Sequence, residues 1–221
     1  ALRKATVGCI DFAFAQDSIA FKRFKELGVA QDKLQQTPNL KAYKASPKVN
    51  HPDLHAIQKV FPYKNTICAA STHKGEDTVL LDALKLSLQK DPSLKMILAP
   101  RHPKRAGEIM ALMDQAGISY ATRSRNELPK TTDQVYLADT MGEMDLWYAS
   151  SAVTFVAGSI TQVGGHTPFE PASHYSALIH GSHYANFKDI YDDLVGGGGS
   201  CQGDTPAEIA DCWEKLRDDT E

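Results

Sequence analysis

Short apolar runs alternate along the chain with longer segments in which apolar residues recur every three or four positions. The short runs predict strands over residues 12–16, 66–70, 94–99, 119–122, 134–138, 152–157 and 177–179. The periodic segments predict helices over residues 17–28, 51–60, 77–90 and 206–217, and further helices that end at 117, contain 146–148 and end at 194. Residues 35–41 are predicted to form a loop, and 196–199 a flexible glycine coil. This repetition predicts an α/β fold, a Rossmann-like parallel sheet with helices on both faces.

The stretch Val156–Pro171 combines a buried strand end, several glycines and a helix start. Thr167 is predicted as the N-cap, Pro168 as the first helical residue, and Glu170 lies in the first turn. Such a start would turn backbone N–H groups outward, toward a phosphate or carboxylate. An ordinary turn without a ligand remains the alternative, because isolated glycine-rich loops are weak motifs.

Three further polar loops follow predicted strands: Ser71–Glu76, Pro100–Arg105 and Asp139–Glu143. Because the carboxyl ends of parallel strands share one sheet edge, we expect these loops to converge there. Their cations and helix starts suit a nucleotide phosphate, although a solvated turn at Arg101 is the simpler alternative. No P-loop motif occurs, and no GxGxxG motif follows the first strand. The histidine spacings match no metal motif, so no metal is expected.

The composition is that of a globular protein: 221 residues, 42% hydrophobic and 23% charged, with a net charge of −3. This charge does not favour nucleic acid as a partner. Four cysteines without a CxxC pair are expected to be buried free thiols of a reducing compartment, hence the cytoplasm. No apolar run is long enough to span a membrane. Ala1 is not a start methionine, so the sequence can be part of a longer chain.

Five motifs occur in order at fitting intervals. They are Ala70–Glu76, Pro100–Pro103, Asp139–Glu143, Gly164–Glu170 and Asn186–Phe187. Together they resemble the C-terminal half of bacterial 3-deoxy-D-manno-octulosonic acid (Kdo) transferases, from about Asp11 to beyond Leu194. The resemblance implies the C-terminal domain of a GT-B glycosyltransferase, in which that domain binds CMP-Kdo and an N-terminal domain binds the lipid A precursor. Residues 1–50 would then lead from the missing acceptor domain, and 51–221 would bind the donor.

The resemblance also assigns roles to individual residues. CMP contacts fall on Pro100, Arg101, Met141, Gly142, Glu143, Thr167, Pro168, Phe169 and Glu170. Lys41 matches the family lysine that stabilises the transition state, and no cofactor besides the donor substrate is implied. Thr167 replaces the family's usual Asn, and Ala157 its usual Gly.

In the family, the general base lies in the N-terminal domain, so this chain alone is expected to bind CMP without transferring Kdo. The implied setting is lipopolysaccharide synthesis at the cytoplasmic face of the inner membrane, where the full-length protein would contact the membrane surface and this fragment would be soluble. Two alternatives remain open: a GT-B enzyme for another nucleotide sugar, and a nucleotide-binding module without catalysis.

Overall fold

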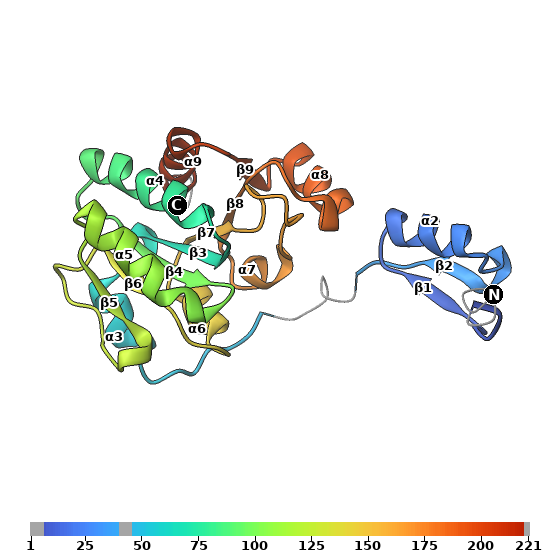
Figure 1. Ribbon diagram of the computed structural model, residues 1–221, viewed down its shortest axis with the longest axis horizontal. Helices are drawn as coiled ribbons and strands as arrows, with labels where there is room; N and C mark the ends of the chain where they lie inside the picture. Colours follow the sequence, from blue (N-terminus) through green and yellow to red (C-terminus); the bar gives the residue numbers. More distant parts are fainter. Residues whose placement is uncertain (1–6, 40–45, 219–221) are drawn as a thin grey trace. The chain divides into compact units, whose positions relative to one another are not determined.

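The computed structural model describes residues 7–39 and 46–218, and Figure 1 labels its helices and strands. The chain divides into two compact units, Ala1–Ala45 and Ser46–Glu221. The division predicted from the sequence falls after residue 50. That the first unit leads from a missing acceptor domain stays a prediction.

The first unit is a small β–α–β arrangement. Its elements are β1 (Ala13–Ala15), α2 (Ser18–Leu27), the 3-10 turn η1 (Gln31–Lys33) and β2 (Leu34–Gln36), with β1 and β2 parallel. The predicted helix is confirmed, because Asp17 accepts a hydrogen bond from the N–H of Ala20 at 2.6 Å and Gly28 ends the helix with φ at +96°. Strand β2 was predicted as loop, since only its first residue is apolar and buried.

The second unit is built on a seven-stranded parallel sheet in the order β5-β6-β4-β3-β7-β8-β9. The strands are β3 (Thr66–Thr72), β4 (Lys95–Pro100), β5 (Tyr120–Thr122), β6 (Val135–Leu137), β7 (Val153–Val156), β8 (Ala177–His180) and β9 (Ser200–Gln202). The predicted α/β class and parallel sheet are therefore confirmed. Strand β9 was not predicted, since it is three residues long and only partly buried.

Helices cover both faces of this sheet (Figure 1). They are α3 (Leu54–Val60), α4 (Glu76–Lys90), α5 (Ala106–Ala116), α6 (Met144–Ala149), α7 (Phe169–Ser173), α8 (Lys188–Gly196) and α9 (Pro206–Asp218). Alternate residues of β3 enter different cores: Ile67 packs with α4, α5 and α9, whereas Cys68 packs with α3 and α6. This two-sided burial explains why the strands are continuous apolar runs. The predicted flexible coil is wrong at its start, since α8 continues to Gly196.

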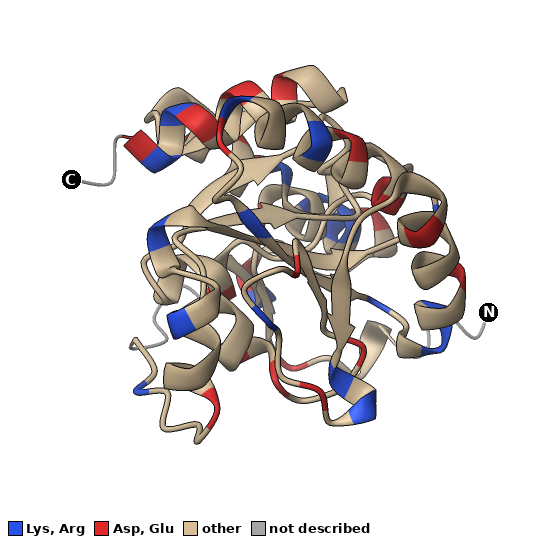
Figure 2. Ribbon diagram, turned by 90° about the vertical axis from the view of Figure 1, so that its left-hand side faces the viewer, with Lys and Arg blue, Asp and Glu red and all other residues tan. Residues whose placement is uncertain are grey.

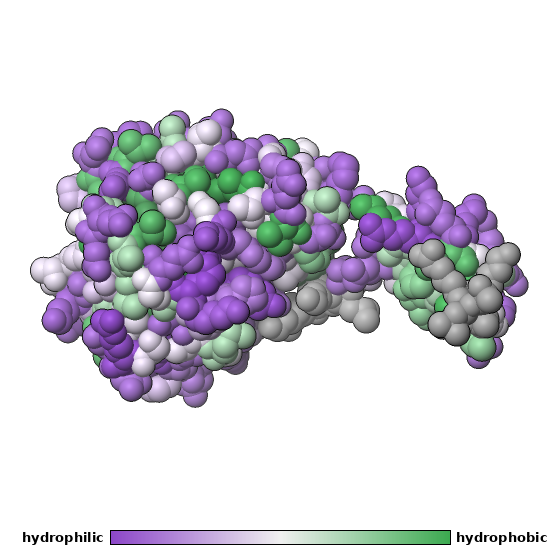
Figure 3. Space-filling view, in the orientation of Figure 1, coloured by the Kyte–Doolittle hydropathy of each residue, from purple (hydrophilic) through white to green (hydrophobic). Residues whose placement is uncertain are grey.

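The surface of the larger unit mixes both signs of charge along its helices (Figure 2). It is mainly hydrophilic, although hydrophobic residues reach the surface along α4 (Figure 3), where Leu86 is 39% exposed. Among the helices within residues 7–39 and 46–218, none combines the length and the apolar character that a membrane crossing needs.

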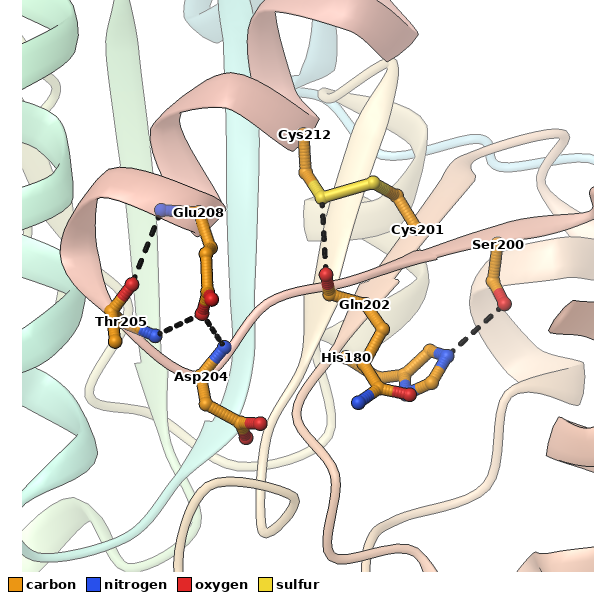
Figure 4. The surroundings of a disulfide bond; sticks show 8 residues. All are labelled: His180, Ser200, Cys201, Gln202, Asp204, Thr205, Glu208 and Cys212. Carbon is orange, nitrogen blue, oxygen red and sulfur yellow. Dashed lines mark hydrogen bonds between the residues drawn. A yellow bond between two sulfur atoms is a disulfide. The ribbon is translucent and has the colours of Figure 1, made fainter.

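The expectation of four buried free thiols is wrong. Cys201 of β9 and Cys212 of α9 form a disulfide bond (Figure 4), and Cys9 is exposed. Of the four cysteines, Cys68 is the one that is buried outside a disulfide, as expected. The two cysteines lie 11 residues apart on consecutive elements, and the pairing was missed because this spacing matches no CxxC motif.

Candidate functional site

A cavity of about 220 Å³ lies at the carboxyl ends of β3, β4, β6 and β7. The chain runs outward from β3 to β4, continues to the edge strand β5, fills the place between them with β6, and then returns on the other side of β3 as β7. The gap between the ends of β3 and β7 is thus a point where the strand order reverses, which is where open parallel sheets bind ligands. The predicted convergence of the polar loops takes place at this cavity.

Most of the residues that the resemblance assigns to nucleotide binding line this cavity. They are Pro100, Arg101, Met141, Gly142, Thr167 and Glu170. Glu143, Pro168 and Phe169 are not among the lining residues. Lys41 lies outside the described residues. The cavity therefore unites side chains from three loops that are far apart in the sequence.

The glycine-rich loop after β7 is held by a buried carboxylate rather than left open for a ligand. Glu76, the first residue of α4, is fully buried. Its two oxygens accept hydrogen bonds of 2.8 to 3.1 Å from the backbone N–H groups of His73, Gly158, Ser159 and Ile160. The expectation that this loop turns its N–H groups outward is therefore wrong for the three donors at 158–160. Their role is to fix the cavity wall.

Two histidines meet beside that wall. The Nε2 atoms of His73 and His166 are 2.8 Å apart, and the two nearly parallel rings meet edge to edge with their centroids separated by 5.1 Å. Burial lowers the pKa of both imidazoles, and for His166 the neighbouring His73 and Arg101 lower it further. A neutral pair is therefore favoured, with one ring donating and the other accepting.

Strand β3 ends in an irregular backbone. Ser71 lines the cavity with φ at +61°, and the register with β4 shifts between Ala70 and Thr72. A left-handed serine is uncommon and is often found where a ligand is held. Nothing in the local sequence signals this conformation, since no glycine or asparagine stands there.

Two neighbouring arginines have different surroundings. Arg105 binds the buried Asp77 and donates to the carbonyl of Thr72 at 3.2 Å, so its charge is used inside the fold. The side chain of Arg101 is exposed on the cavity rim, and none of the ion pairs found within the described residues includes it. Arg101 can therefore offer its guanidinium to an anion.

Comparisons with known proteins show which family the chain is similar to. No family model matches the chain. The chain is 37% identical over 187 residues to the 3-deoxy-D-manno-octulosonic acid transferase of Haemophilus influenzae, covering 84% of this chain and 44% of the relative. The Rickettsia bellii protein of the same name is 28% identical over 197 residues, which cover 89% of this chain and 46% of that protein.

A solved structure provides the decisive comparison. The crystal structure of the C-terminal CMP-Kdo binding domain of WaaA from Acinetobacter baumannii matches with a TM-score of 0.71 and 31% identity, covering 76% of this chain and 89% of that one. The chain belongs to the Kdo transferase family. It spans less than half the length of the curated family members that it matches.

Glu143 belongs to the same motif as Met141 and Gly142, but unlike them it does not line the cavity of about 220 Å³. Its carboxylate binds the Arg123 guanidinium, with the closest contact at 2.6 Å, and it also accepts a hydrogen bond from Thr140. His51 approaches it to 3.5 Å. The hydrogen bonds from Arg123 lower the pKa of Glu143. Glu143 lines a separate cavity of about 210 Å³ with residues 47–51. Its contact with Arg123 connects the loop that carries it to the rest of the fold.

The motif Gly164–Glu170 contains the start of a helix, which begins later than predicted. Helix α7 starts at Phe169 with Pro168 as its N-cap, so the predicted capping by Thr167 is wrong. The Thr167 hydroxyl is instead buried and has no hydrogen-bond partner among the described residues. The Glu170 carboxylate likewise makes no hydrogen bond within the described part of the chain, and both residues line the cavity. These unused polar groups are available to a ligand.

No group of three or more His, Cys, Asp or Glu side chains that could hold a metal ion occurs within the ranges that the structure describes.

Proposed function

We propose that the cavity binds the CMP part of CMP-Kdo, and that the protein to which this chain belongs transfers Kdo from CMP-Kdo to a lipid A precursor. The observation that carries the proposal is that Arg101, Met141 and Glu170, from three separate motifs, line one cavity at the carboxyl edge of the sheet. Family membership supports the choice of donor, since the WaaA domain that matches this chain is a CMP-Kdo binding domain.

Each lining group has a chemical role in this proposal. Arg101 pairs with the phosphate, because its guanidinium is exposed and joins no ion pair of the described residues. Glu170 accepts hydrogen bonds from ribose hydroxyls, and the buried Thr167 hydroxyl gains its missing partner. Met141, which is 70% exposed, offers a polarisable face to the cytosine ring. Gly142, with φ at +85°, lets the ligand approach the backbone.

The remaining assigned residues act around these contacts. Glu143 positions the Met141–Gly142 loop through Arg123, and Pro168 and Phe169 begin the short helix that carries Glu170. As Kdo departs, negative charge grows on the CMP phosphate, where Arg101 and Lys41 stabilise it. The general base for the acceptor hydroxyl belongs to the acceptor domain. This division of labour implies that the chain alone binds CMP and transfers no Kdo, and that the complete enzyme works at the cytoplasmic face of the inner membrane.

Calorimetric titration of this chain with CMP, UDP and GDP tests the proposal. We expect CMP to bind most tightly, and Arg101→Ala to weaken CMP binding by about 1.5–3 kcal/mol, the contribution of hydrogen bonds to a charged group. Arg125→Ala is the matched control, because this exposed arginine contacts Met110 outside the cavity. Tighter UDP binding would favour a GT-B enzyme for another nucleotide sugar, and equal CMP binding by the two variants would remove Arg101 from the site.

The alternative of a binding module without catalysis needs a different assay. We expect Kdo transfer to a lipid A precursor when this chain is joined to the N-terminal half of the Haemophilus influenzae relative, and none from this chain alone. Transfer by the isolated chain would contradict the proposed division of labour. Absence of transfer by a folded chimera that binds CMP would favour the module.

A further inference from the structure

The contact between His73 and His166 places two titratable groups at the cavity wall. His73 lies in the loop before α4 and His166 in the loop after β7, and their Nε2 atoms are 2.8 Å apart. The ring planes differ by only 12°. His166 lines the cavity, and the roles proposed above use neither imidazole.

The separation of the two nitrogen atoms limits how many protons the pair can hold. In a neutral pair, one Nε2 carries a hydrogen and donates it, while the other Nε2 accepts and its ring is protonated at Nδ1. The donor ring then keeps one unprotonated nitrogen, its Nδ1. A third proton can bind there without disturbing the contact. A fourth would put hydrogens on both Nε2 atoms and force them apart, so the intact pair takes up one proton and no more.

Without a bound ligand, the surroundings of the pair disfavour uptake of the third proton. Burial is the largest cause of the lowered pKa of both histidines. The nearby cations and the third histidine act in the same direction, and only one carboxylate acts against them. The charged or titratable groups that face the pair are Glu76, Arg101, His102 and Arg105. The Glu76 carboxylate already accepts hydrogen bonds from four backbone N–H groups. The negative charge of a bound ligand is therefore the change that would raise the proton affinity of the pair most.

We propose that the His73–His166 pair takes up one proton from solvent when an anionic nucleotide enters the cavity, so that a neutral wall becomes a cationic one. The inference rests on the proposed function, because it requires that the cavity binds a phosphate. A phosphate held by Arg101 offsets the positive charge that disfavours an imidazolium and attracts the new charge directly. No covalent bond changes, and the proton returns to solvent when the nucleotide leaves.

Proton uptake makes binding depend on pH in a defined direction. Because the ligand raises the proton affinity of the pair, the ligand binds more tightly as the pH falls from the pKa of the bound pair toward that of the empty pair. The steepest possible dependence is about tenfold in affinity per pH unit for one proton. A phosphate monoester loses charge near pH 6 and would obscure the effect. The methyl ester of cytidine 5′-monophosphate keeps one permanent negative charge and is therefore the probe.

The experiment is calorimetric titration of this chain with that ester at pH 7, in two buffers with different heats of ionisation, followed by titrations between pH 6 and 8. We expect an uptake of about 0.3–1 proton per ester bound and an affinity that falls about tenfold from pH 6 to pH 8. His73→Gln and His166→Gln should abolish the uptake and reduce the pH dependence to about twofold or less. His102→Gln, outside the pair, should retain both. Uncharged cytidine should bind without uptake.

The outcomes separate the two proposals. Ester binding without proton uptake at any pH overturns the role of the pair and leaves the proposed function standing. No binding of either CMP or the ester overturns both. If the glutamine variants do not fold, nitrogen-15 NMR of the wild-type histidines decides instead. We expect one Nδ1–H and one Nε2–H tautomer without ligand, and an imidazolium after the ester is added; unchanged neutral rings would overturn the inference.

Discussion

Replacing Glu76 with glutamine tests the central packing argument of the site. Each oxygen of the Glu76 carboxylate accepts two backbone N–H groups, those of His73 and Gly158 on one side and those of Ser159 and Ile160 on the other. An amide of the same shape keeps one oxygen and turns its NH₂ group toward the other two donors. The substitution thus leaves two N–H groups without an acceptor, one of them buried and the other partly buried.

The expected loss of stability follows from those two orphaned groups. Each buried, unsatisfied donor costs about 1–3 kcal/mol, so Glu76→Gln should lower the free energy of unfolding by about 2–6 kcal/mol. That is a large part of the roughly 5–15 kcal/mol by which domains are stable. Asp82→Asn on the same helix is the matched control. Asp82 is half exposed, and its one ion pair among the described residues is with Lys85 at 3.8 Å, so we expect a change within about 0.5 kcal/mol.

Urea unfolding followed by circular dichroism measures both variants, and the transition midpoints are compared at equal slope. Calorimetric titration of Glu76→Gln with CMP should also show weaker binding, because the Gly158–Ile160 wall is no longer held. A loss below about 1 kcal/mol for Glu76→Gln would refute the reasoning, since it would mean that the N–H groups find other acceptors.

Three other predictions concern the supports of the fold. Arg123→Met leaves Glu143 and Asp53 without their shared cation and should cost about 3 kcal/mol at pH 7 in urea unfolding. Because Arg123 lowers the pKa of Glu143, the stability from this pair is present above the unfolded pKa near 4.5 and is lost as the pH falls through the lower folded pKa. The variant should therefore lose less stability than the wild type on acidification, and an equal loss would contradict the assignment. Reducing the Cys201–Cys212 disulfide, which joins residues 11 positions apart, should lower the free energy of unfolding by about 2–3 kcal/mol and Tm by roughly 5–10 °C. Four reactive thiols in the denatured chain before reduction would show that the bond is absent. Gly181→Ala would place a Cβ 2.3 Å from the Ser159 carbonyl oxygen and should cost about 1–3 kcal/mol or more by thermal unfolding, whereas Gly107→Ala, with nothing within 4 Å, should not destabilise the fold.

The sequence alone determined the kinds of element and much of their order. Apolar runs marked the long strands β3, β4 and β7, and Asp17 and Gly28 marked the two ends of α2, because side-chain periodicity and helix capping act over a few neighbouring residues. The same local signals, joined to the rule that parallel strands end at one edge, predicted that the loops bearing Arg101 and Glu170 would converge.

Only the tertiary structure decided which groups face the cavity and which are used inside the fold. Glu76 binds the N–H of Gly158, 82 residues further along the chain, and His73 contacts His166, 93 residues further along. No local sequence pattern could reveal either contact. The motif assigns Glu143 a CMP contact, which stays a prediction, and only the structure shows that Arg123 binds its carboxylate. These partners are set by strand order and helix packing, because a hydrogen bond depends on atoms within about 3 Å in space, whatever their separation along the chain.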